Sequence, residues 1–422
     1  MKLFTLVAFA LATLSSFAAT NLMEFEPRSG LPNFFPKTQT TGEVRVAYLG
    51  GSITAADGWR PKTLKWFQEK YPHAKFSEIN AAIGGTGSDL GVFRLQHDVL
   101  DYRPDLLFVE FAVNDAGAAR DQIHRAMEGI VRQTWRAFPE CDICFVYTIA
   151  GNMLETEQAG KLPRSIEAME ELANYYRIPS INFGLEVARL EKDGKLIFKA
   201  PKPTNDVQRA ALQGKMVFSS DAVHPHAETG HELYRQAVAR AFEQMSAMPA
   251  KVVQHSLGTP LRADNFEHAK MFPLRPEFLK GNWQKMDAAT NNLAKSFSKR
   301  VPDVWRASDA GDALEFKFRG SAVSVYDFLG PDCGQLRVTL DGKDLGLKSR
   351  FDQYCTYHRL GSLWVGGNLT NAVHAVKISL DATPLDKAAI LARGNEKITR
   401  PEKFVGHNWY AGALLIDGDI VP

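Results

Sequence analysis

The chain has 422 residues, of which 45% are hydrophobic and 23% charged, and its formal net charge is +2. This ordinary composition excludes a disordered tail protein, a collagen-like fibre and a small disulfide-stapled domain. The 50 Lys and Arg residues nearly balance the 48 Asp and Glu residues, which argues against a nucleic-acid-binding protein because such proteins usually show a basic excess. At about 150 residues per domain, the length predicts roughly two to three domains.

The amino-terminal residues have the layout of a secretory signal peptide. Lys2 precedes an apolar run from Leu3 to Leu14, and Ser16 and Ala18 then provide the small side chains needed for cleavage after Ala18. The run is too short to cross about 30 Å of hydrocarbon as a membrane anchor. We therefore expect a secreted or periplasmic protein without a membrane span, whose signal peptide covers residues 1–18.

From about residue 44 to 245, short apolar runs alternate with longer amphipathic stretches. The apolar runs predict strands at 44–49, 79–83, 106–113, 144–149 and 178–183. The amphipathic stretches predict helices at 61–71, 88–100, 118–138, 165–177 and 229–246. This alternation predicts a three-layer α/β/α domain with a parallel sheet. Because ligands of such sheets bind at the carboxyl ends of the strands, we expect the chemistry in the loops that follow them.

After residue 250 the pattern changes to prolines and then to short alternating segments. The latter predict strands at 313–318, 322–326, 335–340, 375–380 and 411–420, with a hairpin turn at Asp341-Gly342. Many short strands separated by turns predict an antiparallel β-sandwich or jelly roll. The predicted organisation is a signal peptide (1–18), an N-terminal extension (19–43), an α/β domain (44–250), a linker (251–299) and a β-sandwich domain (300–422).

The four cysteines leave several interpretations open. Cys333 and Cys355 lie in the strand-rich region, where a disulfide between them would join neighbouring strands. Cys141 and Cys144 have a C-x-x-C spacing, which fits a redox pair, half of a zinc site or a strand-entry pair without chemistry. No second cysteine pair or histidine pair lies nearby in the sequence, and this favours the last interpretation.

Four polar motifs follow predicted strands or precede the last helix of the α/β domain. Ser52 follows two glycines, which permit a tight turn, although Gly-Gly-Ser is also a common loop sequence. Asp221 precedes His224 by three residues, a spacing that lets a carboxylate orient an imidazole acting on a serine. The Asn114 amide can stabilise an oxyanion or cap a helix, and backbone N–H groups around Gly85 can also face an oxyanion.

Taken in order, these blocks resemble those of the SGNH hydrolase superfamily, also called GDSL-type esterases, over about residues 44–245. The matching blocks are Gly50-Gly51-Ser52-Ile53-Thr54, Ile83-Gly84-Gly85-Thr86, Val113-Asn114-Asp115 and Asp221-Ala222-Val223-His224-Pro225. Gly51 stands where the family usually has Asp, a departure that also occurs in its carbohydrate-esterase-like branches.

The resemblance implies a role for each matched residue. Ser52 would be the nucleophile, His224 the general base and then acid, and Asp221 the residue that orients His224. The oxyanion hole would consist of the Ser52 backbone N–H, the Gly85 backbone N–H (with Gly84 as the alternative) and the Asn114 side chain. No metal or organic cofactor is implied.

Further candidates lie near these motifs. Trp59, Arg60 and Arg94 are candidates for the substrate pocket, where a Trp beside the nucleophile loop would stack on a sugar face or else pack in the core. His226 and His231 flank His224 but lack an Asp three residues ahead. Separately, Asn368-Leu369-Thr370 fits an N-glycosylation sequon.

The preferred hypothesis is a secreted serine esterase that removes acyl groups, most often acetyl, from carbohydrate. The Gly-Gly-Ser-Ile-Thr branch, the signal peptide and the appended β-rich domain favour a carbohydrate substrate, with glycan contact through that domain. The alternatives are a lipase or thioesterase, and a non-catalytic carbohydrate-binding protein. A dinucleotide-binding loop from Gly85 to Gly91 is disfavoured, because its third glycine comes one place late and it follows the second strand.

Overall fold

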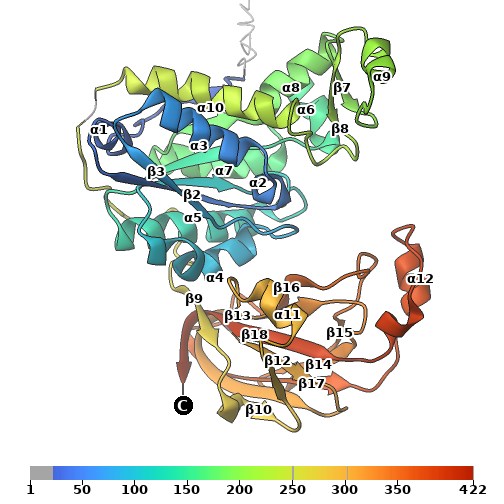
Figure 1. The fold of residues 1–422 in the computed structure, drawn as a ribbon. Helices are drawn as coiled ribbons and strands as arrows, with labels where there is room; N and C mark the ends of the chain where they lie inside the picture. The colour runs from blue at the N-terminus through green and yellow to red at the C-terminus, as the bar shows by residue number, and fades with distance from the viewer. Residues whose placement is uncertain (1–21, 250, 302, 422) are drawn as a thin grey trace, which may run out of the picture.

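The computed structural model describes residues 22–249, 251–301 and 303–421 (Figure 1). The predicted signal peptide at residues 1–18 lies outside the described residues. Within the described ranges, no helix is both long enough and apolar enough to cross a membrane.

The first half of the chain forms a six-stranded sheet. In spatial order its strands are β1 (Phe25–Glu26), β6 (Ser180–Asn182), β5 (Asp142–Tyr147), β4 (Leu106–Glu110), β2 (Glu43–Gly50) and β3 (Lys75–Asn80). Strands β2 to β6 are parallel, and β1 joins one edge in the antiparallel direction. Every residue of the central β4 is buried, as its continuous apolar run predicts.

Helices cover both faces of this sheet, so the predicted α/β/α fold is confirmed (Figure 1). One layer contains α3 (Trp59–Lys70), α8 (Phe183–Lys192) and α10 (Gly230–Ser246), with α10 packed on the other two. The other layer contains α4 (Ser88–Asp98), α5 (Arg120–Ala137) and α7 (Arg164–Tyr176), with α5 packed between its neighbours. Short helices are α1 (Phe34–Thr38), α2 (Ser52–Ala55), α6 (Leu154–Gln158), η1 (Leu100–Tyr102) and η2 (Gly151–Met153).

An insertion between α8 and α10 was not anticipated from the sequence. It consists of β7 (Leu196–Lys199), α9 (Asp206–Ala211) and β8 (Met216–Ser219), and the two strands form a small parallel sheet. Because β8 ends at Ser219, it leads directly into the segment that contains Asp221 and His224.

The C-terminal part forms a ten-stranded antiparallel sheet system, which confirms the predicted β-rich class of this region. Its strands are β9 (Ala269–Pro273), β10 (Leu279–Lys280), β11 (Gln284–Met286), β12 (Val304–Ala307), β13 (Ala313–Leu329), β14 (Gln335–Leu340), β15 (Lys343–Ser349), β16 (Arg359–Gly366), β17 (Ala372–Asp381) and β18 (Trp409–Val421). Short helices are η3 (Pro276–Phe278), α11 (Asn292–Phe297), α12 (Lys387–Ala392) and η4 (Pro401–Phe404).

The long strand β13 organises this region. Its first half pairs with β17 and its second half with β16, while β18 runs beside most of its length. The two strands expected at 313–318 and 322–326 are therefore one strand, whose register with β18 shifts between Gly320 and Ala322. The hairpin turn after β14 lies where it was expected, and Asp341 and Gly342 both have positive φ, at 51° and 76°.

The two domains share an interface below the sheet of the first domain (Figure 1). Arg300, which follows α11, donates to the backbone carbonyls of Asn80 (2.8 Å) and Ala82 (3.2 Å) at the end of β3. It also forms an ion pair of 3.5 Å with the buried Asp98 of α4. Tyr326 of β13 belongs to the same buried apolar cluster as the core of the first domain. The β-rich domain is thus packed next to the loop that follows β3.

All four cysteines are buried free thiols, so the disulfide considered for Cys333 and Cys355 is absent from this structure. Burial raises the pKa of the Cys141 and Cys144 thiols well above the usual range, because it disfavours the thiolate. These two thiols lie in the apolar core at β5. Their surroundings support the interpretation of a strand pair without chemistry.

Candidate active site

Three side chains from distant parts of the chain form one line of hydrogen bonds. Ser52 begins α2, directly after β2, at the carboxyl edge of the parallel sheet. The Ser52 Oγ lies 2.8 Å from His224 Nε2, and His224 Nδ1 lies 2.7 Å from Asp221 Oδ2. Because the carboxylate holds the proton of Nδ1, Nε2 is left to accept the Ser52 hydroxyl proton.

Hydrogen bonds within the loop after β8 orient the Asp221 carboxylate for this contact. Its Oδ1 accepts hydrogen bonds from the His224 N–H (2.8 Å), the Val223 N–H (2.9 Å) and the Ser219 hydroxyl (2.9 Å). Partial burial alone would raise the pKa of Asp221, but the bonds from His224, Val223 and Ser219 outweigh it and hold that pKa well below its usual range. Asp221 therefore stays ionised, with Oδ2 directed at the imidazole.

Asn114 lies against the nucleophile loop. A Cβ atom added to Gly51 would come within 1.9 Å of Asn114 Oδ1. The Gly51 backbone itself is extended, with φ −92° and ψ −155°, so the glycine is required by space and not by backbone conformation. A side chain at position 51 would therefore displace Asn114 in this structure.

The glycine loop after β3 forms the other side of Ser52. A Cβ atom added to Gly84 would lie 3.6 Å from Ser52 Cβ, whereas one added to Gly85 would meet only open space. Gly85 has φ +73°, which glycine adopts without strain. The loop is anchored to β2 by the Ile83 N–H, which donates to the Gly50 carbonyl at 3.0 Å.

A buried carboxylate, Glu110, supports the nucleophile loop through hydrogen bonds. It was not identified as a functional residue from the sequence. It is fully buried at the end of β4 and accepts hydrogen bonds from the Thr54 hydroxyl (2.8 Å) and the Thr148 hydroxyl (2.6 Å). Burial raises the pKa of Glu110, while the bonds from Thr148, Thr54 and the Gly51 N–H oppose that rise. A single acidic residue at the end of an otherwise apolar strand was the signal that could have identified it.

The structure places Trp59, Arg60 and Arg94 in the interior and not on a substrate surface. Trp59 and Arg94 are 0% exposed and Arg60 is 4% exposed. The Trp59 indole donates to the Thr54 hydroxyl at 3.2 Å, and the Arg60 guanidinium donates to the Thr54 carbonyl at 3.1 Å. Arg94 pairs with Asp98 at 2.8 Å. These residues brace the nucleophile loop and the core, so the core-packing alternative holds for Trp59.

The neighbouring histidines have other partners. His231 is buried and accepts a hydrogen bond from the Trp59 backbone N–H at 3.1 Å. Burial lowers the pKa of His231 to about 4, so this ring is neutral and structural. His226 Nε2 lies 3.3 Å from the Ser220 hydroxyl.

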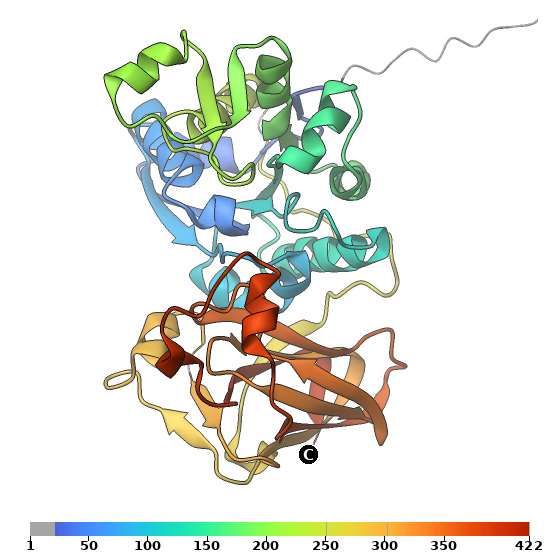
Figure 2. The ribbon, with the colours of Figure 1, turned by 90° about the vertical axis from the view of Figure 1, so that its right-hand side faces the viewer.

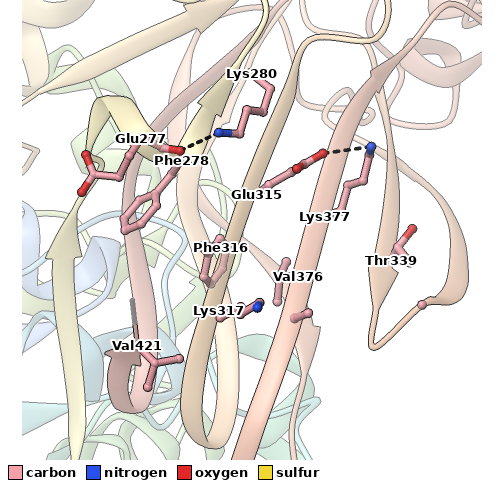
Figure 3. A pocket seen from close by; sticks show the side chains of 12 residues that line it. Glu277, Phe278, Lys280, Glu315, Phe316, Lys317, Thr339, Val376, Lys377 and Val421 are labelled. Atoms are coloured by element: carbon pink, nitrogen blue, oxygen red, sulfur yellow. Dashed lines mark hydrogen bonds and ion pairs between the residues drawn. The ribbon is translucent and has the colours of Figure 1, made fainter.

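A cavity of about 450 Å³ opens beside the oxyanion candidates. Gly85 and Asn114 line it together with the polar residues Asp89 and Asp115 and, from the β-rich domain, Trp364. A second cavity, of about 610 Å³, lies on the β-rich domain and is lined by residues of β13, β17 and η3 (Figure 3). Of these two cavities, the first is the one lined by Gly85 and Asn114.

Comparison with known proteins identifies a matching family and similar structures. Residues 48–233 match the model of the GDSL-like lipase/acylhydrolase family. A two-domain esterase active on acetylated mannans, co-crystallized with mannopentaose, has a similar structure, with a TM-score of 0.70 and 18% identity over 92% of this chain and 94% of that chain. An acetylxylan esterase from Geobacillus stearothermophilus matches with a TM-score of 0.37 and 16% identity, over 48% of this chain and 96% of that chain. None of the curated protein sequences matches this chain.

The matched segment begins within β2 and extends into α10, so it contains all four motif blocks and the elements that carry them. The two-domain esterase further shares the order of an α/β domain followed by a β-rich domain. Residues 48–233 thus form a domain that matches the GDSL-like lipase/acylhydrolase (SGNH) family, and the chain is a carboxylic ester hydrolase.

Proposed function

We propose that the protein is a secreted serine esterase that removes acetyl groups from carbohydrate through Ser52, His224 and Asp221. The observation that carries the proposal is the line of hydrogen bonds from Asp221 through His224 to Ser52, at 2.7 and 2.8 Å, beside Asn114. In a domain of an acylhydrolase family, this arrangement is the one that activates a serine hydroxyl.

The first half-reaction would form an acetyl-enzyme. Ser52 Oγ attacks the ester carbonyl carbon while His224 Nε2 takes the hydroxyl proton, and Asp221 stabilises the resulting imidazolium. The carbonyl oxygen becomes an oxyanion, which accepts hydrogen bonds from the Ser52 N–H, the Gly85 N–H and the Asn114 side-chain N–H. When the intermediate collapses, His224 returns the proton to the departing sugar oxygen.

The second half-reaction would release acetate. Water attacks the acetyl-enzyme carbonyl as His224 accepts one of its protons, and the same oxyanion donors stabilise the second intermediate. Collapse of this intermediate breaks the bond to Ser52 Oγ, which regains its proton from His224.

Two features support acetylated carbohydrate as the substrate. The two-domain esterase with the same architecture acts on acetylated mannans. The cavity beside Asn114 is lined by the polar residues Ser88, Asp89 and Asp115, which can form hydrogen bonds with sugar hydroxyls, and by apolar and aromatic side chains that can pack on a sugar ring. The signal-peptide pattern at residues 1–18 supports secretion, which would place the enzyme where polymeric glycans occur.

The test compares wild type, Ser52→Ala and the matched control Ser220→Ala, whose hydroxyl contacts only His226 among the three histidines of this region. We expect wild type to release acetate from acetylated mannan or xylan and to prefer 4-nitrophenyl acetate over 4-nitrophenyl octanoate. Ser52→Ala should lose about 10⁴-fold or more in kcat, and Ser220→Ala should retain activity. Full activity in Ser52→Ala would refute the nucleophile, and a preference for octanoate would refute the deacetylase in favour of a lipase.

A further inference from the structure

The cavity beside Asn114 is built by both domains. The α/β domain contributes the loop after β3, the loop after β4 and the start of α5, whereas the β-rich domain contributes Trp364 of β16. Figures 1 and 2 both show the β-rich domain directly beneath the helix layer that contains α4 and α5. A ligand that reaches from Ser52 into this cavity therefore meets a side chain of the second domain.

Trp364 is held in place although it is exposed. Its side chain is 44% exposed, while its neighbours Leu363 and Val365 are buried. The indole lies against the backbone of Gly367, because a Cβ atom added there would come within 2.5 Å of the Trp364 ring. An exposed indole with a fixed orientation at the wall of a polar cavity is the feature that stacks on a sugar ring.

The segment that follows Trp364 is also tied to the α/β domain. Arg125 of α5, which lines the cavity, donates to the side-chain oxygen of Asn368. Arg125 also forms an ion pair of 3.5 Å with Asp264, in the segment between the domains. The position of Trp364 relative to Asn114 is thus fixed by contacts across the interface.

Two carboxylates also line this cavity. A Cβ atom added to Gly87 would lie 2.4 Å from Asp115 Oδ1 and 2.9 Å from Asp89 Oδ1, so the two acids flank this glycine. Asp115 is 4% exposed, and its Oδ1 accepts from the Ser88 N–H at 3.0 Å. Its Oδ2 has no hydrogen-bond partner among the described residues. A buried carboxylate oxygen without a hydrogen-bond donor is unfavourable, so a ligand hydroxyl that donates to it would be stabilised at this site.

We propose that this cavity binds a pyranose ring of the acetylated oligosaccharide, with Trp364 against one face of the ring and Asp89 and Asp115 bonded to its hydroxyl groups. The inference rests on the proposed function and deepens it, because it assigns a specificity residue to the β-rich domain. The cavity volume of about 450 Å³ falls within the usual range for small-molecule sites.

The test uses two substrates of different size on the full-length enzyme: acetylated mannooligosaccharides, which fill the cavity, and 4-nitrophenyl acetate, which does not. Trp364→Ala should lower kcat/KM about tenfold on the oligosaccharide, mainly through KM, and change kcat/KM on 4-nitrophenyl acetate less than twofold. Trp364→Phe should recover part of the loss because it keeps an aromatic face. Tyr102→Ala is the matched control, since Tyr102 is an exposed aromatic residue (54%) of the α/β domain outside this cavity.

The outcomes separate the two proposals. If wild type hydrolyses neither substrate, the proposed function fails. If wild type is active and Trp364→Ala loses equally on both substrates, or on neither, the subsite is refuted while the esterase stands. Should Trp364→Ala fold poorly, Trp364→Phe and Asp89→Asn carry the test, and unchanged oligosaccharide KM in both overturns the proposal.

Discussion

Among the Asp–His pairs of the two domains, one pair from each shares the same contact and differs in what the second ring nitrogen faces. In the α/β domain, His224 Nδ1 lies 2.7 Å from Asp221, and in the β-rich domain His374 Nδ1 lies 2.7 Å from Asp341. The second ring nitrogen of His224 faces the Ser52 hydroxyl at 2.8 Å, whereas that of His374 faces the Thr370 carbonyl at 2.9 Å. A carbonyl has no proton to give, so His374 can only donate.

The surroundings of His374 match a structural role. Burial alone would lower its pKa, but the bonds to Asp341 and the Thr370 carbonyl outweigh this and raise the pKa of His374, because both acceptors favour the doubly protonated ring. An Asp–His contact alone therefore does not identify a catalytic histidine. A hydroxyl must also lie within hydrogen-bond distance of the second ring nitrogen. In this chain that hydroxyl comes from the carboxyl end of a parallel strand.

The strongest test of the comparison replaces each histidine with glutamine. His224→Gln should lower kcat on acetyl esters by about 10⁴-fold or more, because the serine loses its base. His374→Gln should keep wild-type activity and reduce the free energy of unfolding by about 1 kcal/mol through its lost hydrogen bonds. Ester hydrolysis and urea denaturation measure the two effects. A comparable loss of activity in both variants would contradict the distinction.

The second test concerns the space around the nucleophile loop. Gly51→Ala should displace the Asn114 side chain, since the new Cβ would lie within 1.9 Å of Asn114 Oδ1. We expect kcat to fall about 10²- to 10³-fold, as for removal of one oxyanion donor, and Asn114→Ala should show a similar loss. Gly117→Ala is the matched control, because a Cβ atom there meets nothing within 4 Å. If Gly51→Ala kept full kcat, Asn114 would have no role in the oxyanion hole.

Much of the α/β domain could be predicted from sequence because its central strands are buried on both faces. The apolar run at 106–113 marks β4, although the strand ends at Glu110 and the chain then turns. The edge strand β3 was placed four residues late, because Lys75–Asn80 contains only two apolar residues, Phe76 and Ile79, and the apolar stretch after it is loop. Proximity of Ser52, His224 and Asp221 was expected from the resemblance to the SGNH family and not from strand order, because β8, which leads into Asp221, lies in a separate two-stranded sheet.

What the sequence did not reveal depends on contacts between distant segments. The buried state of Trp59 arises from packing against Tyr48, Phe108 and Phe183, which no local pattern shows. Trp364 looks like any residue of an alternating strand, and only the docking of the two domains places it in the cavity of Asn114.

A third test compares two carboxylates of the α/β domain with opposite environments. Burial raises the pKa of Asp115 to about 7, with smaller contributions from the charges of Asp89 and Glu110, whereas that of Asp221 is lowered. A carboxyl whose pKa is higher in the folded protein than in the unfolded chain stabilises the folded protein while it is protonated. This stabilisation is complete below the pKa in the unfolded chain, near 4, and is lost as the pH rises through the pKa in the folded protein, about 7. In wild type, Asp115 should therefore lower the free energy of unfolding between pH 4 and 7, by at most about 1.4 kcal/mol per pH unit.

Asp115→Asn removes this titration and retains an oxygen for the Ser88 N–H. The gap in unfolding free energy between the variant and wild type should grow in favour of the variant up to about pH 7 and then level off, as measured by urea denaturation at several pH values. Asp57→Asn, whose side chain is 96% exposed, serves as the control and should follow the wild-type slope. A pH-independent gap for Asp115→Asn would show that the carboxyl is not protonated on folding.

The smallest expected effect concerns the second cavity, on the β-rich domain. Glu315 and Lys377 are directly opposite each other on β13 and β17 and form an ion pair of 2.9 Å at its wall (Figure 3). Their side chains are 37% and 58% exposed, so solvent screens the pair, and Lys377→Ala should change the free energy of unfolding by about 0.2–1 kcal/mol. Hydrolysis of the oligosaccharide should stay at the wild-type level, in contrast to Trp364→Ala. A loss on the oligosaccharide equal to that of Trp364→Ala would instead indicate that the bound glycan extends from the active site to this second cavity. An exposed ion pair that only stabilises the β-rich domain would not change hydrolysis of the oligosaccharide.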